Sequence, residues 1–380
     1  MQDTYADFFD LEDDLFYLNH AAVAPWPKRA SEAVARFAEE NARLGAARYP
    51  HWLTVERRLK EALATLIQAA PDDVALVKNT SEGLSLVAYG LDWRAGDNIV
   101  TSNQEFPSNR IVWESLSQFG VELRQVDLNA GASPEAALLE HVDERTRLLT
   151  ISSVEYASGL RLDLETLGQG CRARDVLFCI DAIQSVGALQ FDVNATQADF
   201  VIADGHKWLL GPEGLGLFYC RPAIRERVRV LQYGWHMVDP LGDYDSPTWQ
   251  ITPTARRFEC GSPNMLCIHA LEASVGVLLE LGMQNVEAAV LNNASYLMAR
   301  VNEHPRLELL TDSRAGRYAG IVTFRPQGFD VEALAKLHRR LMARRVICAS
   351  RGGGIRFSPH FHTSHAVLDQ ALAILDDCLE

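Results

Sequence analysis

Short apolar runs, each bounded by polar or turn-forming residues, recur along the first part of the chain. Runs of this kind predict buried strands. They lie at 73–77, 98–102, 121–126, 148–154, 176–181, 200–203 and 215–219. Between them come segments whose apolar residues recur with a helical period, which predicts helices that pack one face against a core.

The predicted helices differ in composition along the chain. Residues 28–44 are rich in Ala and Glu, and 52–69 carries an apolar stripe typical of core or dimer-face packing. The segment 231–254 follows neither period and is expected to be a long loop. After Gly282 the composition shifts to an Ala-, Leu- and Arg-rich pattern with a strand at 320–324, which predicts a smaller α+β domain. Further helices are predicted at 84–89, 163–173, 264–280, 285–301, 331–344 and 368–379.

Composition narrows the functional classes. Lys and Arg number 36 against 50 Asp and Glu, so the formal net charge is −14, which argues against nucleic acid or an anionic membrane as the main partner. No apolar run approaches the roughly 20 residues of a membrane helix. The acidic N-terminus lacks the basic start and apolar core of a signal peptide. The seven cysteines include no Cys-x-x-Cys pair, which favours a reducing, cytoplasmic location.

A lysine just beyond a predicted strand is the strongest candidate for chemistry. The run 200–203 leads into Asp204-Gly-His-Lys207, and a glycine-rich turn follows. Desolvation lowers the pKa of such a lysine and makes its amine a nucleophile suited to a Schiff base, although a solvated lysine is the ordinary alternative. The preceding predicted strand ends in Asp181. Enzymes that use pyridoxal phosphate need a lysine and an acidic partner for the pyridine nitrogen, and two consecutive strand ends supply them.

The sequences around these two residues resemble a family signature. Asp181-Ala-Ile-Gln184 and Asp204-Gly-His-Lys-Trp-Leu-Leu-Gly-Pro212 are similar to segments of the class V, fold-type I pyridoxal phosphate enzymes, which include cysteine desulfurases, isopenicillin N epimerase-like proteins and kynureninase. The resemblance covers nearly the whole chain. It implies an α/β homodimer whose mostly parallel, seven-stranded sheet, with helices on both faces, binds pyridoxal 5'-phosphate. It also implies an N-terminal segment 1–27 that joins the small domain, a large cofactor-binding domain at 28–282 and a small α+β domain at 283–380.

The resemblance implies a role for each residue of the paired motif. Asp181 would pair with the protonated pyridine nitrogen, and Lys207 would form the Schiff base. Gln184 would contact the phenolic oxygen of the cofactor, and His206 would contact its phosphate. Many relatives have a serine on the phosphate at the position of Asp204. Because a carboxylate repels a phosphate dianion, we expect Asp204 to point away or to bond elsewhere.

A turn after the first predicted strand is a candidate phosphate site. Thr80 and Ser81 stand where this strand passes into an apolar helix, and either of them is suited to cap that helix. An ordinary N-cap is the reading that the residues alone favour, but the resemblance to a Thr-Ser-Glu turn of the family implies that both hydroxyls bind phosphate. The segment Arg257-Phe-Glu-Cys-Gly-Ser-Pro263 resembles the stretch with which relatives reach the phosphate of the partner subunit, and Ser262 is the matching hydroxyl.

Three positions bear on the reaction. Phe106 stands where cysteine desulfurases have a histidine that stacks on the pyridine ring; a phenyl ring keeps the stacking but removes an acid/base group. Tyr156 stands where relatives have an asparagine near the phenolic oxygen, and its hydroxyl donates a hydrogen bond with a different reach. Cys348 lies in an apolar run, which favours a buried, unreactive thiol over a sulfur-accepting nucleophile. These features favour a lyase- or epimerase-like branch.

The remaining candidates concern the substrate and a metal. Arg356 follows three glycines, and its match to the family segment Ile/Val-Arg-x-Ser-Pro-His implies that its planar fork holds the α-carboxylate. The resemblance also places Asn19 and His20 beside the substrate, with a locally hydrogen-bonded loop histidine as the alternative for His20. His360 and His362 alternate along an extended segment, but no third ligand is indicated, so no metal site is predicted.

These observations predict a pyridoxal phosphate-dependent enzyme that acts on an amino acid. Lys207 would remove the α-proton while Arg356 orients the substrate. A lyase or epimerase-like reaction at Cα or Cβ is the first hypothesis, class V transamination is the second, and cysteine desulfuration is less favoured. A non-catalytic binding module that keeps the fold is the alternative from a different class, which the joint presence of Lys207, Asp181 and Arg356 disfavours.

Overall fold

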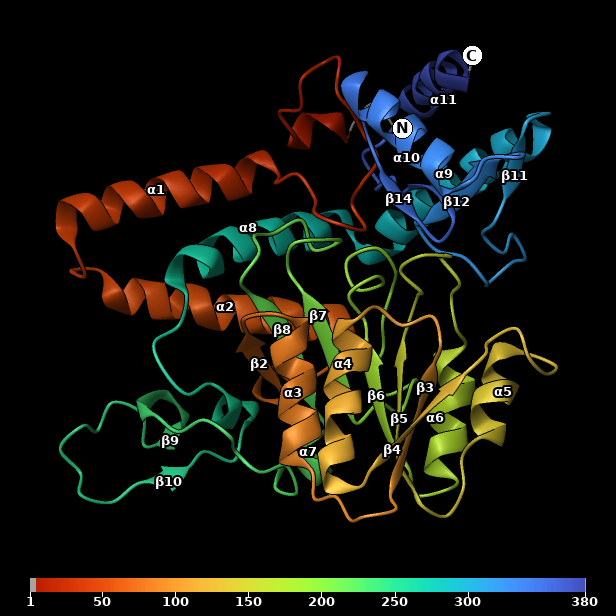
Figure 1. Ribbon diagram of the computed structural model, residues 1–380. Coiled ribbons are helices and arrows are strands. Elements are labelled where there is room, and N and C mark those ends of the chain that lie inside the picture. The colour runs from red at the N-terminus through yellow and green to blue at the C-terminus, as the bar shows by residue number, and fades with distance from the viewer. Residues whose placement is uncertain (1–4, 380) are drawn as a thin grey trace.

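A seven-stranded sheet forms the centre of the protein, in the order β2-β8-β7-β6-β5-β3-β4 (Figure 1). The computed structural model describes residues 5–379. Strand β8 pairs antiparallel with β2 and β7, and the other pairs are parallel, which confirms the predicted, mostly parallel sheet. The strands are β2 (Val74–Val77), β3 (Asn98–Ser102), β4 (Glu122–Val126), β5 (Thr146–Ser152), β6 (Leu177–Asp181), β7 (Phe200–Asp204) and β8 (Gly216–Cys220).

Both faces of the sheet are buried. Because side chains alternate across a strand, consecutive residues enter opposite cores. Along β7, Phe200 and Ile202 pack into one apolar cluster, whereas Val201 and Ala203 pack into the other. A strand covered on both faces needs no polar positions, which explains the continuous apolar runs in the sequence.

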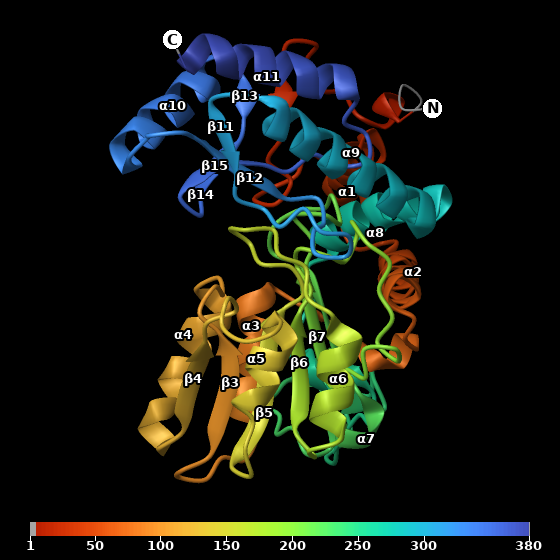
Figure 2. The same cartoon turned by 90° about the vertical axis from the view of Figure 1, so that its right-hand side faces the viewer.

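Helices cover the two faces (Figures 1 and 2). The face that contains Val201 packs against α2 (Tyr49–Ile67), α5 (Pro134–Glu140), α6 (Leu164–Arg172) and α8 (Met265–Leu281). The face that contains Ile202 packs against α3 (Thr80–Gly90), α4 (Ser108–Glu114) and α7 (Pro222–Arg225). Parallel strands need crossover connections, and several of these helices also return the chain to the start of the next strand.

A second, four-stranded antiparallel sheet lies beyond one end of the large sheet (Figure 2). It contains β11 (Leu307–Leu309), β12 (Val322–Pro326), β15 (Gly354–Phe357) and β14 (Ala349–Arg351). Helices α9 (Met283–Glu303), α10 (Val331–Ala343) and α11 (His365–Leu379) share its core.

The start of the chain joins this second unit. Strand β1 (Phe16–Tyr17) pairs in parallel with β13 (Val346–Ile347), and Leu18 enters the same apolar cluster as Phe324 and Phe357. The pairing agrees with an N-terminal segment that belongs to the small domain, whereas the boundaries at residues 27 and 282 stay predictions.

Two further elements project from the edge of the sheet (Figure 1). Helix α1 (Lys28–Leu44) coincides with the predicted helix, and both α1 and α2 contact α8. The segment 231–254 is an extended arm that carries two short antiparallel strands, β9 (Val238–Asp239) and β10 (Gln250–Ile251), rather than an entirely irregular loop. Among residues 5–379, no single helix is long and apolar enough to cross a membrane, and the pair α8 and α9, bent by 86°, meets the test only when taken together.

Candidate active site

Most of the predicted site residues converge on one cavity. It has a volume of about 280 Å³ and lies where β6 and β7 end, below the hairpin of β14 and β15. In open α/β sheets, ligands bind at the carboxyl ends of the strands. Asn19, His20 and Ser262 lie outside its lining. The predicted residues that line it are Thr80, Ser81, Phe106, Tyr156, Asp181, Gln184, His206, Lys207 and Arg356.

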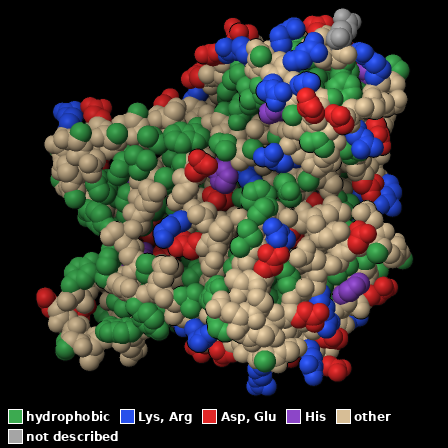
Figure 3. Space-filling view, in the orientation of Figure 1, with side chains coloured by type: hydrophobic (Ala, Val, Ile, Leu, Met, Phe, Trp, Pro, Cys, Tyr) green, Lys and Arg blue, Asp and Glu red, His purple; other side chains and the backbone are tan. Residues whose placement is uncertain are grey.

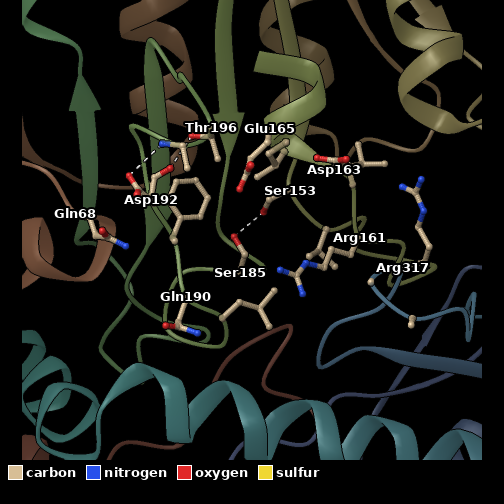
Figure 4. Close-up of a pocket in the computed structure, with 18 residues that line it drawn as sticks. Gln68, Ser153, Arg161, Asp163, Glu165, Ser185, Gln190, Asp192, Thr196 and Arg317 are labelled. Atoms are coloured by element: carbon tan, nitrogen blue, oxygen red, sulfur yellow. Dashed lines mark hydrogen bonds between the residues drawn. The ribbon is translucent and has the colours of Figure 1, made fainter. Parts of the chain in front are cut away.

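A larger cavity of about 660 Å³ contains none of these residues (Figure 4). Side chains of both charges, such as Arg161 and Glu165, are spread around its wall. The hydroxyls of Ser153 and Ser185 form a hydrogen bond with one another, with their oxygens 2.7 Å apart. Its groups therefore do not converge on a reacting atom, and chemistry rather than volume identifies the smaller cavity as the candidate active site.

Asp181 is the last residue of β6, and its side chain is buried. Its Oδ1 accepts a hydrogen bond from the backbone N–H of Ile183 at 3.1 Å. Burial raises the pKa of Asp181 to about 6, while the Ile183 N–H and the charge of Lys207 oppose the shift. A buried carboxylate gains from a cationic partner, and a protonated pyridine nitrogen would be one.

Lys207 follows β7 on a tight turn. A Cβ on Gly205 would lie 2.8 Å from the carbonyl oxygen of Leu215, so this turn needs a glycine. The Lys207 side chain is buried, and burial lowers its pKa to about 8, although the charge of Asp181 opposes the shift. A larger share of the amine is therefore neutral near pH 7 than in an exposed lysine, and the neutral amine is the form that reacts with an aldehyde.

The N-terminus of α3 presents a free hydroxyl. Asn79 caps this helix, because its side chain accepts a hydrogen bond from the N–H of Glu82 at 2.9 Å. The alternative of an ordinary N-cap at Thr80 or Ser81 therefore does not hold. Within the described chain, the buried Thr80 hydroxyl has no hydrogen-bond partner. The Ser81 hydroxyl donates to Oγ of Ser108 at 2.9 Å. An unpaired buried hydroxyl at a helix N-terminus fits a phosphate oxygen, so the residues present suit the phosphate of the cofactor.

Two aromatic residues form another part of the wall. Phe106 is 42% exposed, and Nζ of Lys207 lies 5.6 Å from the centre of its ring. The rings of Phe106 and Tyr156 meet edge to face, with centroids 5.1 Å apart. A phenyl ring that faces the lysine amine is placed to cover a planar group attached there, which is the predicted stacking role of Phe106.

Gln184 is engaged by the protein at both ends of its amide. Its Nε2 donates to the carbonyl of Ala21 at 3.1 Å, and its Oε1 accepts from Nε1 of Trp208 at 2.8 Å. A contact with the phenolic oxygen would therefore use the second hydrogen of Nε2. The amide also ties the N-terminal segment to the turn that contains Lys207.

Asp204 lines the cavity but bonds within its own turn. Its Oδ1 accepts a hydrogen bond from the N–H of Gly205 at 2.9 Å and lies 3.1 Å from Nδ1 of His206. The contact with His206 is not a hydrogen bond, because the buried Nδ1 of His206 has no hydrogen-bond partner in the described chain. The carboxylate thus bonds to the N–H of Gly205, in agreement with the expectation that Asp204 bonds elsewhere than to a phosphate. The phosphate role of His206 itself stays a prediction.

Arg356 is buried beside the cavity with unused donors. Its Nη1 donates to the carbonyl of Tyr156 at 2.6 Å, its Nη2 lies 3.5 Å from Oδ1 of Asn19, and its Nε has no partner in the described chain. Burial lowers the pKa of Arg356 to about 10, and the charge of Arg351 adds to this effect. A buried guanidinium of this kind gains from a carboxylate partner. Asn19 reaches the site through Arg356 rather than as part of the wall.

His20 lies behind the cavity wall. Its side chain is fully buried, and Nδ1 lies 2.9 Å from the carbonyl oxygen of Ser358. Burial lowers the pKa of His20 to about 4, so it is neutral near pH 7. The structure thus favours the locally hydrogen-bonded histidine over a residue that borders the substrate.

His20 packs against the two histidines of the C-terminal segment, with ring centroids 5.3 Å from His360 and 5.0 Å from His362. His360 uses both ring nitrogens locally, because Nε2 lies 3.1 Å from the carbonyl of Trp208 and Nδ1 accepts from the N–H of Phe361. Among residues 5–379, these histidines do not form a group with three converging metal ligands. Neither ring nitrogen of His362, nor Nε2 of His20, has a hydrogen-bond partner in the described chain, so the absence of a metal site stays a prediction.

Another cluster has the spacing of a metal site but already holds a cation. Glu56, His236 and Glu259 bring one ligand atom each within 4.8 Å of the others. Nζ of Lys60 lies 2.8 Å from Glu259 and 3.7 Å from Glu56. The ammonium takes the place that a metal ion would need, so the cluster is an ion-pair network that anchors the base of the arm to α2.

Ser262 and Cys348 lie apart from the cavity. Ser262 is exposed in a neighbouring cleft that also contains Asn79, so it faces outward next to the start of α3. Cys348 is buried, and burial raises the pKa of its thiol to about 12, as expected for an unreactive cysteine. The partner-subunit role of Ser262 stays a prediction.

Sequence reasoning missed several residues of the site. Ser108, Ser152 and Arg351 line the cavity but belong to no predicted role. Glu105 lies behind Ser152 and accepts hydrogen bonds from its N–H at 2.7 Å and its hydroxyl at 2.6 Å. Burial raises the pKa of Glu105 to about 7. The available signal was an acidic residue close to a strand end, directly before Phe106.

Similarity to known proteins extends over nearly the whole chain. The family model described as Aminotransferase class-V matches residues 16–355. A probable cysteine desulfurase of Methanothermobacter thermautotrophicus is 29% identical, over 97% of this chain and 94% of the relative. Isopenicillin N epimerase of Streptomyces clavuligerus is 30% identical, over 96% of this chain and 95% of the relative.

Solved structures show the same fold. The cystine C–S lyase C-DES, in complex with its product cysteine persulfide, superposes with a TM-score of 0.88 over 96% of this chain and 98% of that one, at 24% identity. At this identity the likeness concerns the fold alone.

We expect the substitution Thr80→Val to weaken pyridoxal phosphate binding about 10- to 100-fold, because it removes one hydrogen bond to a charged group. Equilibrium titration of cofactor-free protein with pyridoxal phosphate measures the effect. Ser85→Ala is the matched control, since Ser85 lies further along the same helix, bonds the carbonyl of Ser81 and does not line the cavity. Equal affinities of wild type and Thr80→Val would remove Thr80 from the phosphate site.

Proposed function

Because the chain belongs to the class-V aminotransferase family, it is a pyridoxal phosphate-dependent enzyme, and we propose that it eliminates a substituent from Cβ of an amino acid. The observation that carries the proposal is that Lys207, Asp181 and Arg356, from three separate segments, line one cavity that contains no thiol. The family establishes amino acid chemistry at Cα and Cβ, and the choice of elimination rests on the groups in the cavity.

Each of the three residues would have a distinct task. Pyridoxal phosphate supplies an electron sink for the negative charge that develops at Cα when a proton leaves. Asp181 would hold a positive charge at the pyridine nitrogen. Nζ of Lys207 would accept the Cα proton, and its lowered pKa leaves part of the amine unprotonated near neutral pH. Arg356 would bind the α-carboxylate and so fix which Cα bond faces the base.

Elimination needs only these groups. The Cα–H bond breaks and its proton moves to Lys207, the electron pair forms a Cα–Cβ double bond, and the Cβ substituent leaves with its bonding pair. Hydrolysis of the resulting enamine gives a 2-oxo acid and ammonia. Desulfuration would also need a thiol that accepts sulfur, and none of the seven cysteines lines the cavity. The cavity therefore supports elimination better than desulfuration.

Epimerisation is the second candidate. The isopenicillin N epimerase of Streptomyces clavuligerus is a relative over nearly its whole length. Inversion at Cα needs a proton donor on the face opposite Lys207, and the phenol of Tyr156 lines the same cavity. Transamination would use the same three residues, and it needs no further group of the protein.

Exposed aromatic residues support a homodimer. The arm carries Tyr233, Tyr244 and Trp249, which are 64%, 72% and 57% exposed. Figure 3 shows hydrophobic side chains gathered on the side of the molecule where the arm and α1 project. Large exposed apolar surfaces of this kind mark interfaces, and a second copy that covers this side would bury them close to Ser262. The unpaired cysteines agree with the expected cytoplasmic location.

Light scattering measures the oligomeric state directly. We expect twice the chain mass for the wild type, and dissociation after Tyr244→Asp with Trp249→Asp, because two charges would enter an apolar interface. Asp243→Asn, a neighbouring substitution that adds no charge, is the matched control. A monomeric wild type would contradict the homodimer.

Product analysis tests the proposed reaction. Holoenzyme incubated with cystine and S-substituted L-cysteines is expected to release pyruvate and ammonia, whereas an epimerase would yield the D-amino acid and a transaminase would need a second oxo acid. Lys207→Ala is expected to lower the rate of product formation about 10²- to 10⁴-fold, since it removes the base. Cys348→Ala is the control and should keep it. Loss of activity in Cys348→Ala, with alanine instead of pyruvate as the wild-type product from L-cysteine and a persulfide on Cys348, would establish a desulfurase instead.

A further inference from the structure

The cavity contains a second guanidinium group that the proposed reaction does not use. Arg351 lines the cavity together with Arg356, yet it belongs to a different strand of the hairpin. A single α-carboxylate needs one such fork. The presence of a second one calls for its own explanation.

Strand register places the two arginines on the same face. In the hairpin of β14 and β15, Ala349 pairs with Arg356, and Arg351 pairs with Gly354. Residues that pair directly share a face, and side chains alternate along each strand, so Arg351 lies on the same face as Arg356. The two are diagonal neighbours, a relation in which the residue positions are typically about 7–8 Å apart. Ile355 points to the opposite face and is fully buried in the core of the small sheet. This core contact fixes the register, so both arginines point toward the cavity.

The hairpin turn keeps Arg351 at the mouth of the cavity. Gly352 and Gly353 both have positive φ, at 59° and 76°, which is the geometry of a tight two-residue turn. The turn is exposed, and so is Arg351, whereas Arg356 is 3% exposed. The wall thus carries one cation deep in the cavity and a second at its opening.

Arg351 has no anionic partner within residues 5–379. The only hydrogen bond of its side chain within those residues runs from Nη1 to the carbonyl of the preceding Ser350, at 2.9 Å. Three carboxylates line the cavity, but Asp181 and Asp204 lie on the floor with backbone partners, and Glu213 forms no ion pair with Arg351 in the described chain. The two neighbouring guanidinium groups repel one another, and the charge of Arg351 accordingly contributes to the lowered pKa of Arg356. Anions bound at both positions would remove this repulsion.

We infer that Arg351 selects a substrate whose side chain ends in a second anionic group. The inference rests on the proposed function, since it assigns the α-carboxylate to Arg356. The substrate class is an amino acid with a leaving group at Cβ and a carboxylate or similar anion beyond it, held across the two arginines. An arginine at the mouth also attracts such a substrate through long-range electrostatics.

A matched pair of conjugates tests the selection. S-carboxymethyl-L-cysteine and S-carbamoylmethyl-L-cysteine have nearly the same shape and differ in one negative charge. Wild-type holoenzyme is expected to favour the carboxymethyl compound by about tenfold or more in kcat/KM, the ratio that corresponds to about 1.4 kcal/mol. Arg351→Gln is expected to reduce this ratio to near one, and Arg351→Lys to retain part of it, because a lysine keeps the charge but loses the fork.

Arg325→Gln is the matched control. Arg325 lies on β12 of the same sheet, pairs with Glu308 at 2.8 Å and does not line the cavity. This variant should keep the wild-type ratio. A wild-type ratio near one, or an unchanged ratio in Arg351→Gln, would overturn the assignment.

Binding of simple acids separates this inference from the proposed reaction. Glutarate has two carboxylates and butyrate has one, and neither undergoes elimination. Calorimetry should show glutarate binding to holoenzyme about tenfold more tightly than butyrate, with the difference lost in Arg351→Gln. If neither conjugate is turned over but this difference is found, elimination is wrong and the second anion site stands. If both conjugates are turned over and glutarate has no advantage, elimination stands and the second anion site is wrong.

Discussion

The candidate active site depends on the burial of the Asp181 carboxylate and the Lys207 amine at the ends of two adjacent strands. Strands β6 and β7 are parallel neighbours, so their carboxyl ends lie side by side and bring Asp181 and Lys207 to the same cavity. Burial moves both pKa values toward neutrality, to about 6 for Asp181 and about 8 for Lys207. Each charge favours the other, which partly offsets the cost of removing them from water. The two apolar cores on either side of the sheet keep these strand ends fixed.

The rest of the site closes over this pair from distant parts of the chain. The N-terminal segment is tied to the floor by Gln184 and contributes Asn19, which lies beside the guanidinium of Arg356. The hairpin of β14 and β15 brings two cations over the opening. In the proposed function, the groups that carry the chemistry therefore lie on the large sheet, whereas those that would bind the substrate lie on the small sheet.

Much of the fold and the core of the site could be predicted from local patterns. A buried strand appears in the sequence as a continuous apolar run. Because the sheet fixes the position of the residues at the end of each strand, Asp181 and Lys207 could be predicted as site residues from the sequence. The helices α4 and α5 span 7 residues each, which is too short for a clear helical period, and both were missed. The cap of α3 could not be predicted from the sequence, because Asn79, Thr80 and Ser81 are all favoured at an N-cap and only the hydrogen bonds identify Asn79 as the cap.

The environment of other residues depends on contacts that no local pattern encodes. His20 is buried by a segment more than 300 residues away, at Ser358 and His360. Arg351 is the last residue of an ordinary hairpin strand, and only the register with Arg356 places it in the cavity. Long-range contacts of this kind decide which residues of a motif face the ligand and which support it.

The most direct test of this account is the rate at which cofactor-free protein becomes yellow with pyridoxal phosphate, measured across pH. The neutral amine of Lys207 reacts, so the rate in the wild type should rise about tenfold per pH unit at low pH and level off above a pH of about 8. Lys207→Ala should stay colourless after removal of free cofactor. A stable yellow protein with Lys207→Ala, formed at the wild-type rate, would contradict the assignment of Lys207 and with it the central claim.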